Sequence, residues 1–210
     1  MIKNIVFDLG GVFVGLNRVR CLDNFRKIGF LDFDNTLNEY HQGGYFLDYE
    51  KGTISSEEFR TFIQRGVDRP LADDEIDYAL ASFLENIPKY KIELLLSLRE
   101  RGYSIYLLSN SNEICIREVK SFFAGYGLDF DTFFDKRFLS YEMKMVKPDP
   151  EIFVKVLEEA RIEAEETLFV DDYRPNIESA SAIGFKTLLY DVKDNLAEKI
   201  DSALTENILS

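Results

Sequence analysis

The sequence has few of the residues that build disulfide frameworks or histidine-rich metal centres. Its 210 residues include two cysteines, Cys21 and Cys115, and one histidine, His41. Two cysteines form neither a disulfide framework nor a zinc-binding spacing, and they indicate reduced thiols inside a cell. A single histidine cannot supply a histidine-rich metal site, nor a Ser-His-Asp triad assembled in the usual way.

Basic residues are also scarce. The chain has 25 Lys and Arg against 38 Asp and Glu, a formal net charge of −13. Affinity for phosphate backbones and anionic membranes comes mainly from Lys and Arg, so the acidity argues against nucleic-acid or membrane binding. A small anionic substrate stays open, because it needs only one local cationic pocket.

Long apolar runs are absent from the sequence. No stretch approaches the roughly 18 apolar residues of a membrane span. The apolar run near the N-terminus resembles a signal peptide at first glance, but Asp8 interrupts it and no small-residue cleavage segment follows. We therefore expect a soluble, cytoplasmic protein.

Short apolar runs with helical patterns between them indicate an α/β fold. The runs are typical of strands buried on both faces and cover residues 4–8, 104–109, 167–172 and 186–191, with a weaker one at 137–140. Pro88 and Asp149-Pro150 suit helix starts, and 176–183 has a helical pattern. This alternation predicts a Rossmann-like open parallel sheet.

Residues 16–83 interrupt this pattern directly after the first predicted strand. They contain no convincing buried strand, and stretches such as 56–65 and 74–84 have helical patterns. We expect a small helical cap domain at 16–83, inserted into a core domain of residues 1–15 and 84–210.

Polar and charged side chains lie at the ends of three predicted strands and in the connection before Pro150. They are Asp8, Ser109, Asn110, Lys147, Asp171 and Asp172. Each alone is typical of a turn or a cap, but ligands of open parallel sheets bind beyond the C-terminal ends of the strands. Three converging carboxylates suit Mg²⁺, Ser109 and Lys147 suit a phosphate, and Asp8 suits a carboxylate nucleophile.

Four segments carry a family resemblance. They are Ile5-Val6-Phe7-Asp8-Leu9-Gly10-Gly11-Val12, Leu107-Leu108-Ser109-Asn110, Lys147-Pro148-Asp149-Pro150-Glu151-Ile152-Phe153, and Leu168-Phe169-Val170-Asp171-Asp172 with Asn176 following. In these segments, which span nearly the whole chain, the sequence resembles the haloacid dehalogenase-like (HAD) hydrolase superfamily. Within this superfamily, the motif sequences resemble those of a capped phosphatase branch that includes bacterial alpha-glucose-1-phosphate phosphatase.

The resemblance implies a Mg²⁺-dependent hydrolase of a small phosphate monoester such as a sugar phosphate. Asp8 would form an aspartyl-phosphate intermediate, and Ser109, Asn110 and Lys147 would hold the phosphoryl group. By the same resemblance, the ligands of Mg²⁺ would be the Asp8 carboxylate, the Gly10 carbonyl and Asp172, with Asp171 a further ligand or an acid behind the ligands. The implied partner is a phosphorylated metabolite, and the protein a monomer or homodimer.

One position departs from the family pattern. Phosphatases of this family usually have a second Asp two residues after the nucleophile, where it protonates the leaving alcohol and activates water, and this chain has Gly10. Either the leaving group is an easy one, or a cap residue or water moves the proton. The alternative is an impaired HAD-like protein that binds a phosphorylated ligand.

A second segment matches the first family motif by its letters. Asp32-Phe33-Asp34-Asn35-Thr36-Leu37 includes the second Asp, but no buried strand leads into it, so we assign the nucleophile to Asp8. The residues of the cap and its approach considered for substrate contact are Asn17, Arg18, His41, Gln42 and Tyr45.

Overall fold

The computed structural model describes residues 1–31 and 44–206. Its centre is a parallel sheet of five strands in the order β3-β2-β1-β4-β5. The strands are β1 (Asn4–Phe7), β2 (Ser104–Ser109), β3 (Lys136–Leu139), β4 (Thr167–Asp171) and β5 (Lys186–Leu189). The five predicted strands are therefore confirmed, as is the open parallel sheet.

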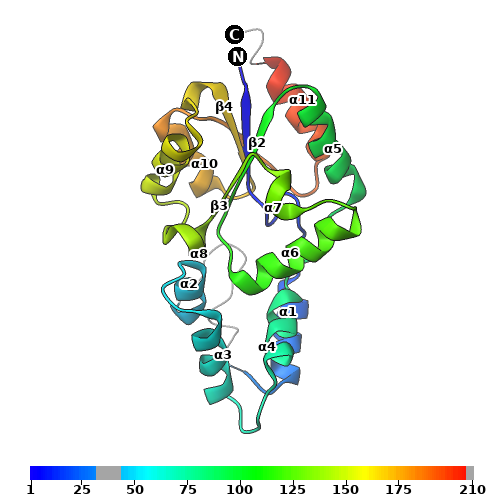
Figure 1. Ribbon diagram of the computed structural model, residues 1–210, viewed down its shortest axis with the longest axis vertical. Helices are drawn as coiled ribbons and strands as arrows, with labels where there is room; N and C mark the ends of the chain where they lie inside the picture. The colour runs from blue at the N-terminus through cyan, green and yellow to red at the C-terminus, as the bar shows by residue number, and fades with distance from the viewer. Residues whose placement is uncertain (32–43, 207–210) are drawn as a thin grey trace.

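Helices cover both faces of the sheet. They are α5 (Lys89–Glu100), α6 (Glu113–Gly125), α9 (Pro150–Ala160), α10 (Arg174–Ile183) and α11 (Leu196–Glu206), with the shorter α7 (Phe130–Phe133), α8 (Ser140–Met143) and the 3-10 turn η2 (Ala164–Glu166). Figure 1 shows α9 and α10 on one side of the strands and α5 and α11 on the other. This is the three-layer α/β/α arrangement expected of a parallel sheet.

Alternating side chains of the central strand supply both halves of the core. Ile5 and Phe7 belong to the apolar cluster that includes α5, α6 and α11, whereas Val6 belongs to the cluster with α9 and α10. Successive side chains of a strand point to opposite faces, so a run with no polar residue is needed to bury both. Phe7 pairs in register with Leu107 and Val170, which aligns the C-terminal ends of three strands.

Four further helices form a separate lobe beyond those strand ends (Figure 1). They are α1 (Arg18–Lys27), α2 (Gly44–Glu50), α3 (Ser56–Arg65) and α4 (Asp73–Ala81), and we call them the cap helices. Helix α3 has the predicted bounds, and its N-cap is Ser55, whose side chain accepts a hydrogen bond from the Glu58 amide. Helix α4 ends earlier than predicted, and α2 was not predicted.

In the described part of the chain, the helices are too short or too polar for a membrane crossing.

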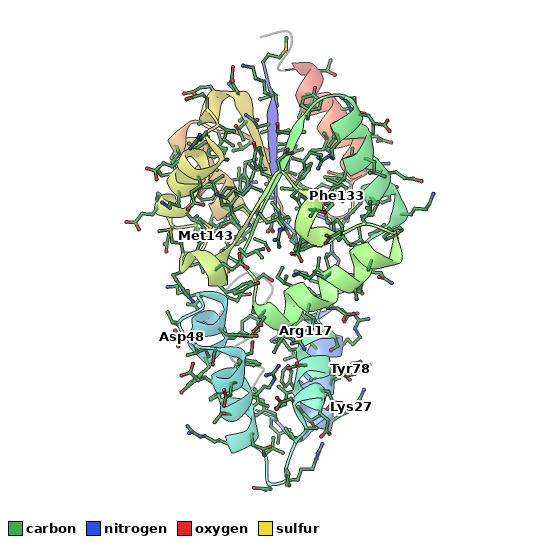
Figure 2. The ribbon with its side chains drawn as sticks, viewed as in Figure 1. Lys27, Asp48, Tyr78, Arg117, Phe133 and Met143 are labelled. Carbon is green, nitrogen blue, oxygen red and sulfur yellow. The ribbon has the colours of Figure 1, made fainter. Side chains whose placement is uncertain are left out.

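Aromatic packing fixes helix α6 against the core. The Phe123 ring is fully buried and lies 5.2 Å from the Phe130 ring and 5.6 Å from the Phe133 ring, centroid to centroid (Phe133 is labelled in Figure 2). Because α6 begins beside the strand ends, this packing also positions the loop after β2.

Removing this ring should destabilise the protein strongly. We expect Phe123→Ala to lower the free energy of unfolding by about 3–5 kcal/mol, because it leaves a cavity in a closed cluster. Phe122→Ala, at a half-buried position of the same helix, should cost much less. Urea unfolding followed by circular dichroism measures both, and equal losses would contradict this account of the core.

Candidate active site at the strand ends

A buried lysine joins two of the predicted acidic residues. Lys147 Nζ lies 2.8 Å from Asp8 Oδ1 and 2.7 Å from Asp171 Oδ2. The Lys147 side chain is 1% exposed and that of Asp171 0%, so water screens this network little. The fold therefore brings together residues that lie far apart in the sequence, as expected from their places at strand ends.

Asp171 already has a full set of hydrogen-bond donors. Besides Lys147, its carboxylate accepts hydrogen bonds from the Asn176 side chain at 3.0 and 3.1 Å and from the Tyr173 amide at 2.8 Å. Asp171 thus acts as an anchor that fixes the Lys147 ammonium group.

Asn110 fixes Lys147 from the other side. Its side-chain amide donates to the Lys147 carbonyl at 2.9 Å, and its carbonyl oxygen accepts from the Lys147 amide at 2.8 Å. Ser109 is buried at the end of β2 and lines the same pocket as Asp8 and Lys147. Of the two residues predicted from this loop, Ser109 lines the pocket, with its hydroxyl donating a long hydrogen bond of 3.3 Å to the Asn110 carbonyl, while the Asn110 side chain positions Lys147.

A third carboxylate completes an acidic cluster. One oxygen from each of Asp8, Asp171 and Asp172 lies within 4.8 Å of the others. Gly11 lets Asp172 approach: a Cβ there would lie 2.0 Å from Asp172 Oδ2, and the φ of Gly11 is +74°. Lys91 donates a hydrogen bond to the Val12 carbonyl and so ties down the loop after β1.

The cluster has a strong electrostatic demand for a cation. Burial raises the pKa of the Asp8 carboxyl above its usual range, and Asp171 and Asp172 raise it further, while Lys147 lowers it only in part. Burial alone would lower the pKa of Lys147, but the neighbouring carboxylates more than offset it, so the pKa rises and the ammonium stays charged. Three carboxylates around one ammonium form an oxygen-rich donor set that fits Mg²⁺.

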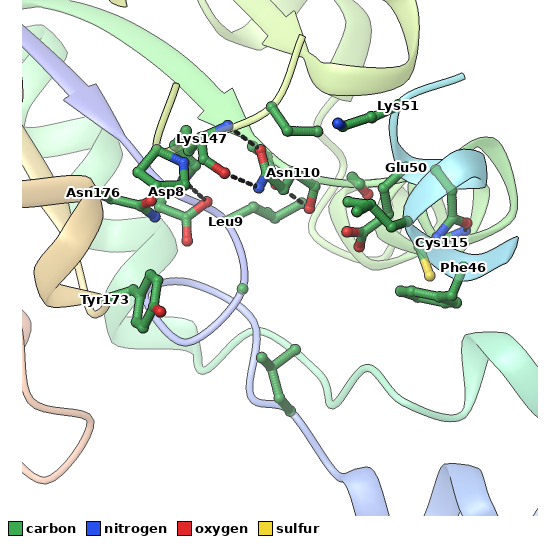
Figure 3. Close-up of a pocket in the computed structure, with 18 of the residues that line it drawn as sticks. Asp8, Leu9, Phe46, Glu50, Lys51, Asn110, Cys115, Lys147, Tyr173 and Asn176 are labelled. Carbon is green, nitrogen blue, oxygen red and sulfur yellow. Dashed lines mark hydrogen bonds and ion pairs between the residues drawn. The ribbon is translucent and has the colours of Figure 1, made fainter. Parts of the chain in front are cut away.

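These groups open into a pocket of about 270 Å³ between the sheet and the cap helices. Its floor includes Asp8, Gly10 and Asp172, and its cap side includes Phe46 and Glu50 of α2. Figure 3 shows Asp8 and Lys147 at one end of the drawn pocket and Glu50 and Phe46 at the other, with Asn110 between. The pocket can hold a small phosphorylated molecule in contact with both parts of the chain.

Glu50 is a buried acidic residue of the pocket that the sequence does not predict as part of the site. It ends α2 and is 7% exposed. Its backbone carbonyl lies 2.6 Å from the Ser140 hydroxyl, and that hydroxyl accepts a hydrogen bond from the Ser111 amide at 2.9 Å. The signal in the sequence is an acidic residue at the end of a mainly apolar stretch, and this short stretch alone does not predict a helix.

Three of the cap residues considered for substrate contact can be placed. Asn17 caps α1 and donates to Glu85 at 3.0 Å, and Tyr45 stacks on Phe62 with the ring centroids 4.1 Å apart. Asn17, Tyr45 and Arg18 are not among the residues lining this pocket. His41, Gln42 and the motif-like segment 32–37 lie outside the described residues.

Comparison with known proteins decides the family. The family model described as haloacid dehalogenase-like hydrolase matches residues 2–184 of the sequence. The chain belongs to this family. D-ribitol-5-phosphate phosphatase of Bacteroides thetaiotaomicron is 38% identical over 188 residues, covering 89% of this chain and 91% of that protein. The expected superfamily is thus confirmed, and relatives are named as phosphatases.

Solved HAD structures share the fold, and one of them contains magnesium and phosphate. A HAD family enzyme from Bacteroides thetaiotaomicron in complex with magnesium and inorganic phosphate is 43% identical, with a TM-score of 0.87, covering 93% of this chain and 97% of that one. A predicted HAD-like family hydrolase from Porphyromonas gingivalis is 38% identical, with a TM-score of 0.87 and coverage of 97% and 98%. The expected cofactor, Mg²⁺, therefore has support from a structural relative as well as from the donor set.

The close approach of Gly11 and Asp172 gives a test of the metal site. We expect Gly11→Ala to weaken Mg²⁺ binding by at least about tenfold, because the new Cβ displaces the Asp172 carboxylate. Isothermal titration calorimetry with Mg²⁺ measures the change.

Gly127→Ala is the matched control for backbone strain. Gly127 has a φ of +72°, and a Cβ there would meet nothing within 4 Å. It should therefore share the strain of Gly11→Ala and keep its Mg²⁺ affinity. Equal affinities for the two variants would show that Asp172 is not a ligand.

Proposed function

We propose that this protein is a Mg²⁺-dependent phosphatase of a small sugar or polyol phosphate. The observation that carries the proposal is the contact of one buried ammonium, Lys147, with both Asp8 and Asp171 at 2.8 and 2.7 Å, beside a third carboxylate. The relative that acts on D-ribitol 5-phosphate supports the substrate class.

The acidic cluster divides into ligands and an anchor. The ligands of Mg²⁺ would be Asp8, Asp172 and the Gly10 backbone carbonyl. Asp171 already accepts hydrogen bonds from Lys147 and the Tyr173 amide, which suits it to hold Lys147 in position rather than to bind the metal directly. When bound, Mg²⁺ supplies positive charge that offsets the repulsion between the carboxylates and a phosphate dianion.

The chain's own groups then account for the transfer of the phosphoryl group. Asp8 attacks phosphorus and forms an aspartyl phosphate, which water later hydrolyses. Lys147 neutralises the phosphate oxygens, and Ser109 with nearby backbone amides donates hydrogen bonds to them. Asn110 and Asp171 keep the ammonium in position, so that little reorganisation is needed during the reaction.

The cap helices would select the substrate. We propose that residues 16–83 act as a cap domain on a core of residues 1–15 and 84–210, and that closure excludes water from the phosphate. A pocket of about 270 Å³ suits a small metabolite. The two free, buried cysteines fit a reducing, cytoplasmic location, and we propose a monomer or homodimer. The alternative, an impaired phosphate binder, gains no support from relatives named as phosphatases.

Two substitutions test which acid is the nucleophile. Asp8→Asn should lower phosphate release by at least about 10³-fold, because an amide cannot form the acyl phosphate. Asp32→Asn, in the segment that matches the family motif by letters, should stay close to wild type. Loss of activity only in the Asp32 variant would overturn the assignment of Asp8.

Metal removal tests the cofactor and the substrate class together. Phosphate release from a panel of sugar, polyol and nucleotide monophosphates should fall to the Asp8→Asn background in EDTA and return with excess Mg²⁺. We expect the sugar and polyol phosphates to give the highest kcat/KM. A panel without Mg²⁺-dependent turnover above that background would refute the proposed function.

A further inference from the structure

Gly10 leaves the reaction without a proton donor on the loop that carries the nucleophile. Expulsion of a primary alkoxide, as from a polyol phosphate, needs a proton on the leaving oxygen. Gly10 has no side chain to give one, and the loop is held by Lys91 through the Val12 carbonyl. The donor must therefore come from elsewhere in the pocket.

The direction of attack locates the donor. Asp8 and Lys147 lie at the sheet end of the pocket (Figure 3). In an in-line displacement the leaving oxygen lies opposite the attacking one. The leaving group therefore faces the cap helices, and so does the water that later attacks the aspartyl phosphate.

One carboxyl group of the cap meets this requirement. Four described carboxyl side chains line the pocket, those of Asp8, Glu50, Asp149 and Asp172. Asp8 attacks, Asp172 faces the metal site, and Asp149 is exposed beside the core helix α9. Glu50 is left, 7% exposed, at the end of α2.

The Glu50 carboxyl group has no partner among the described residues, and its backbone is fixed. Among residues 1–31 and 44–206, none forms a hydrogen bond or ion pair with its carboxyl group, which borders the pocket. Its backbone is tied to the core by the Ser140 hydroxyl at 2.6 Å, and Lys144 of the core donates to the Gly52 carbonyl just beyond it. A buried carboxyl that no described residue pairs with, on a secured backbone, is arranged for a ligand rather than for stability.

We propose that Glu50 is the general acid and base of this enzyme. It takes the role that the second Asp, here replaced by Gly10, has in the usual family pattern. The inference rests on the proposed phosphatase activity. In the first step Asp8 forms a bond to phosphorus, the bond from phosphorus to the leaving oxygen breaks, and that oxygen takes the Glu50 proton. In the second step, the oxygen of a water molecule forms a bond to phosphorus while Glu50 takes a proton from that water. The bond from phosphorus to the Asp8 oxygen breaks, so that phosphate leaves and the Asp8 carboxylate is restored.

The protonation state of Glu50 agrees with this role. Burial raises the pKa of its carboxyl to about 8, with Asp8 adding to the rise and Lys147 opposing it. The group therefore holds a proton at neutral pH, when the leaving oxygen needs one. Its neighbours in the pocket include Lys51 and the neutral thiol of Cys115.

Leaving-group dependence tests the proposal on the intact protein. Glu50→Gln keeps the shape of the side chain and cannot transfer a proton. With Mg²⁺ present, it should slow the first turnover of ribitol 5-phosphate by about 10²-fold or more, and that of p-nitrophenyl phosphate by no more than about threefold. Nitrophenolate leaves without a proton, so its first turnover should appear as a burst before slow hydrolysis of the aspartyl phosphate.

The matched control is Glu57→Gln, at an exposed position of the cap helix α3, which should leave both rates unchanged. Equal loss on the two substrates in Glu50→Gln, or no loss on ribitol 5-phosphate, would overturn the role of Glu50. Wild-type protein inactive on both substrates would instead refute the phosphatase activity itself.

A second variant covers the case in which Glu50→Gln does not fold. Glu50→Ala opens space beside the leaving group, and added formate, at a mildly acidic pH where part of it is formic acid, should restore part of the rate with ribitol 5-phosphate. Formate should not change the burst with p-nitrophenyl phosphate. A folded Glu50→Ala protein that formate does not rescue would count against proton transfer by this side chain.

Discussion

The site depends on the placement of one ammonium group, Lys147, between Asp8 and Asp171 away from water. Removing a charge from water costs several kcal/mol, so such a group persists only where opposite charges and hydrogen bonds replace its hydration. Asp171 provides this from the sheet, with Asn176 and Tyr173 fixing its carboxylate in turn. The balance is incomplete, because Asp172 adds a third carboxylate. That surplus of negative charge favours the binding of a divalent cation such as Mg²⁺.

Two local positive charges, the Lys147 ammonium and a Mg²⁺ held by the surplus carboxylates, explain how an acidic protein can bind a phosphate. A formal net charge of −13 repels anions at long range. Inside the pocket, however, the Lys147 side chain is 1% exposed and close to the substrate, so its attraction is screened far less than that of surface charges. A bound Mg²⁺ and this lysine together reverse the sign of the local field. Net charge therefore predicts poor affinity for nucleic acids but not the chemistry of the pocket.

The sequence predicted the parts of the site that follow from strand ends. Apolar runs located β1, β2 and β4, and the rule that parallel strands end at one edge brought Asp8, Ser109 and Asp171 together. The role of Asn110 did not follow, because its hydrogen bonds to the Lys147 backbone exist only once two distant loops are adjacent. Glu50 was missed for a similar reason: its burial results from contact between α2 and the core, not from the local pattern of α2.

The position of Glu50 also bears on why the cap belongs to the chemistry and not only to recognition. In the usual family pattern, the nucleophile and the acid stand on one loop of the core. Here Gly10 removes the acid from that loop, and the other buried carboxyl lies on α2, held to the core by Ser140. Catalysis on a poor leaving group then requires the cap and core to be in contact, whereas attack on an activated ester does not. The contact between cap and core that selects the substrate thus also places the proton donor.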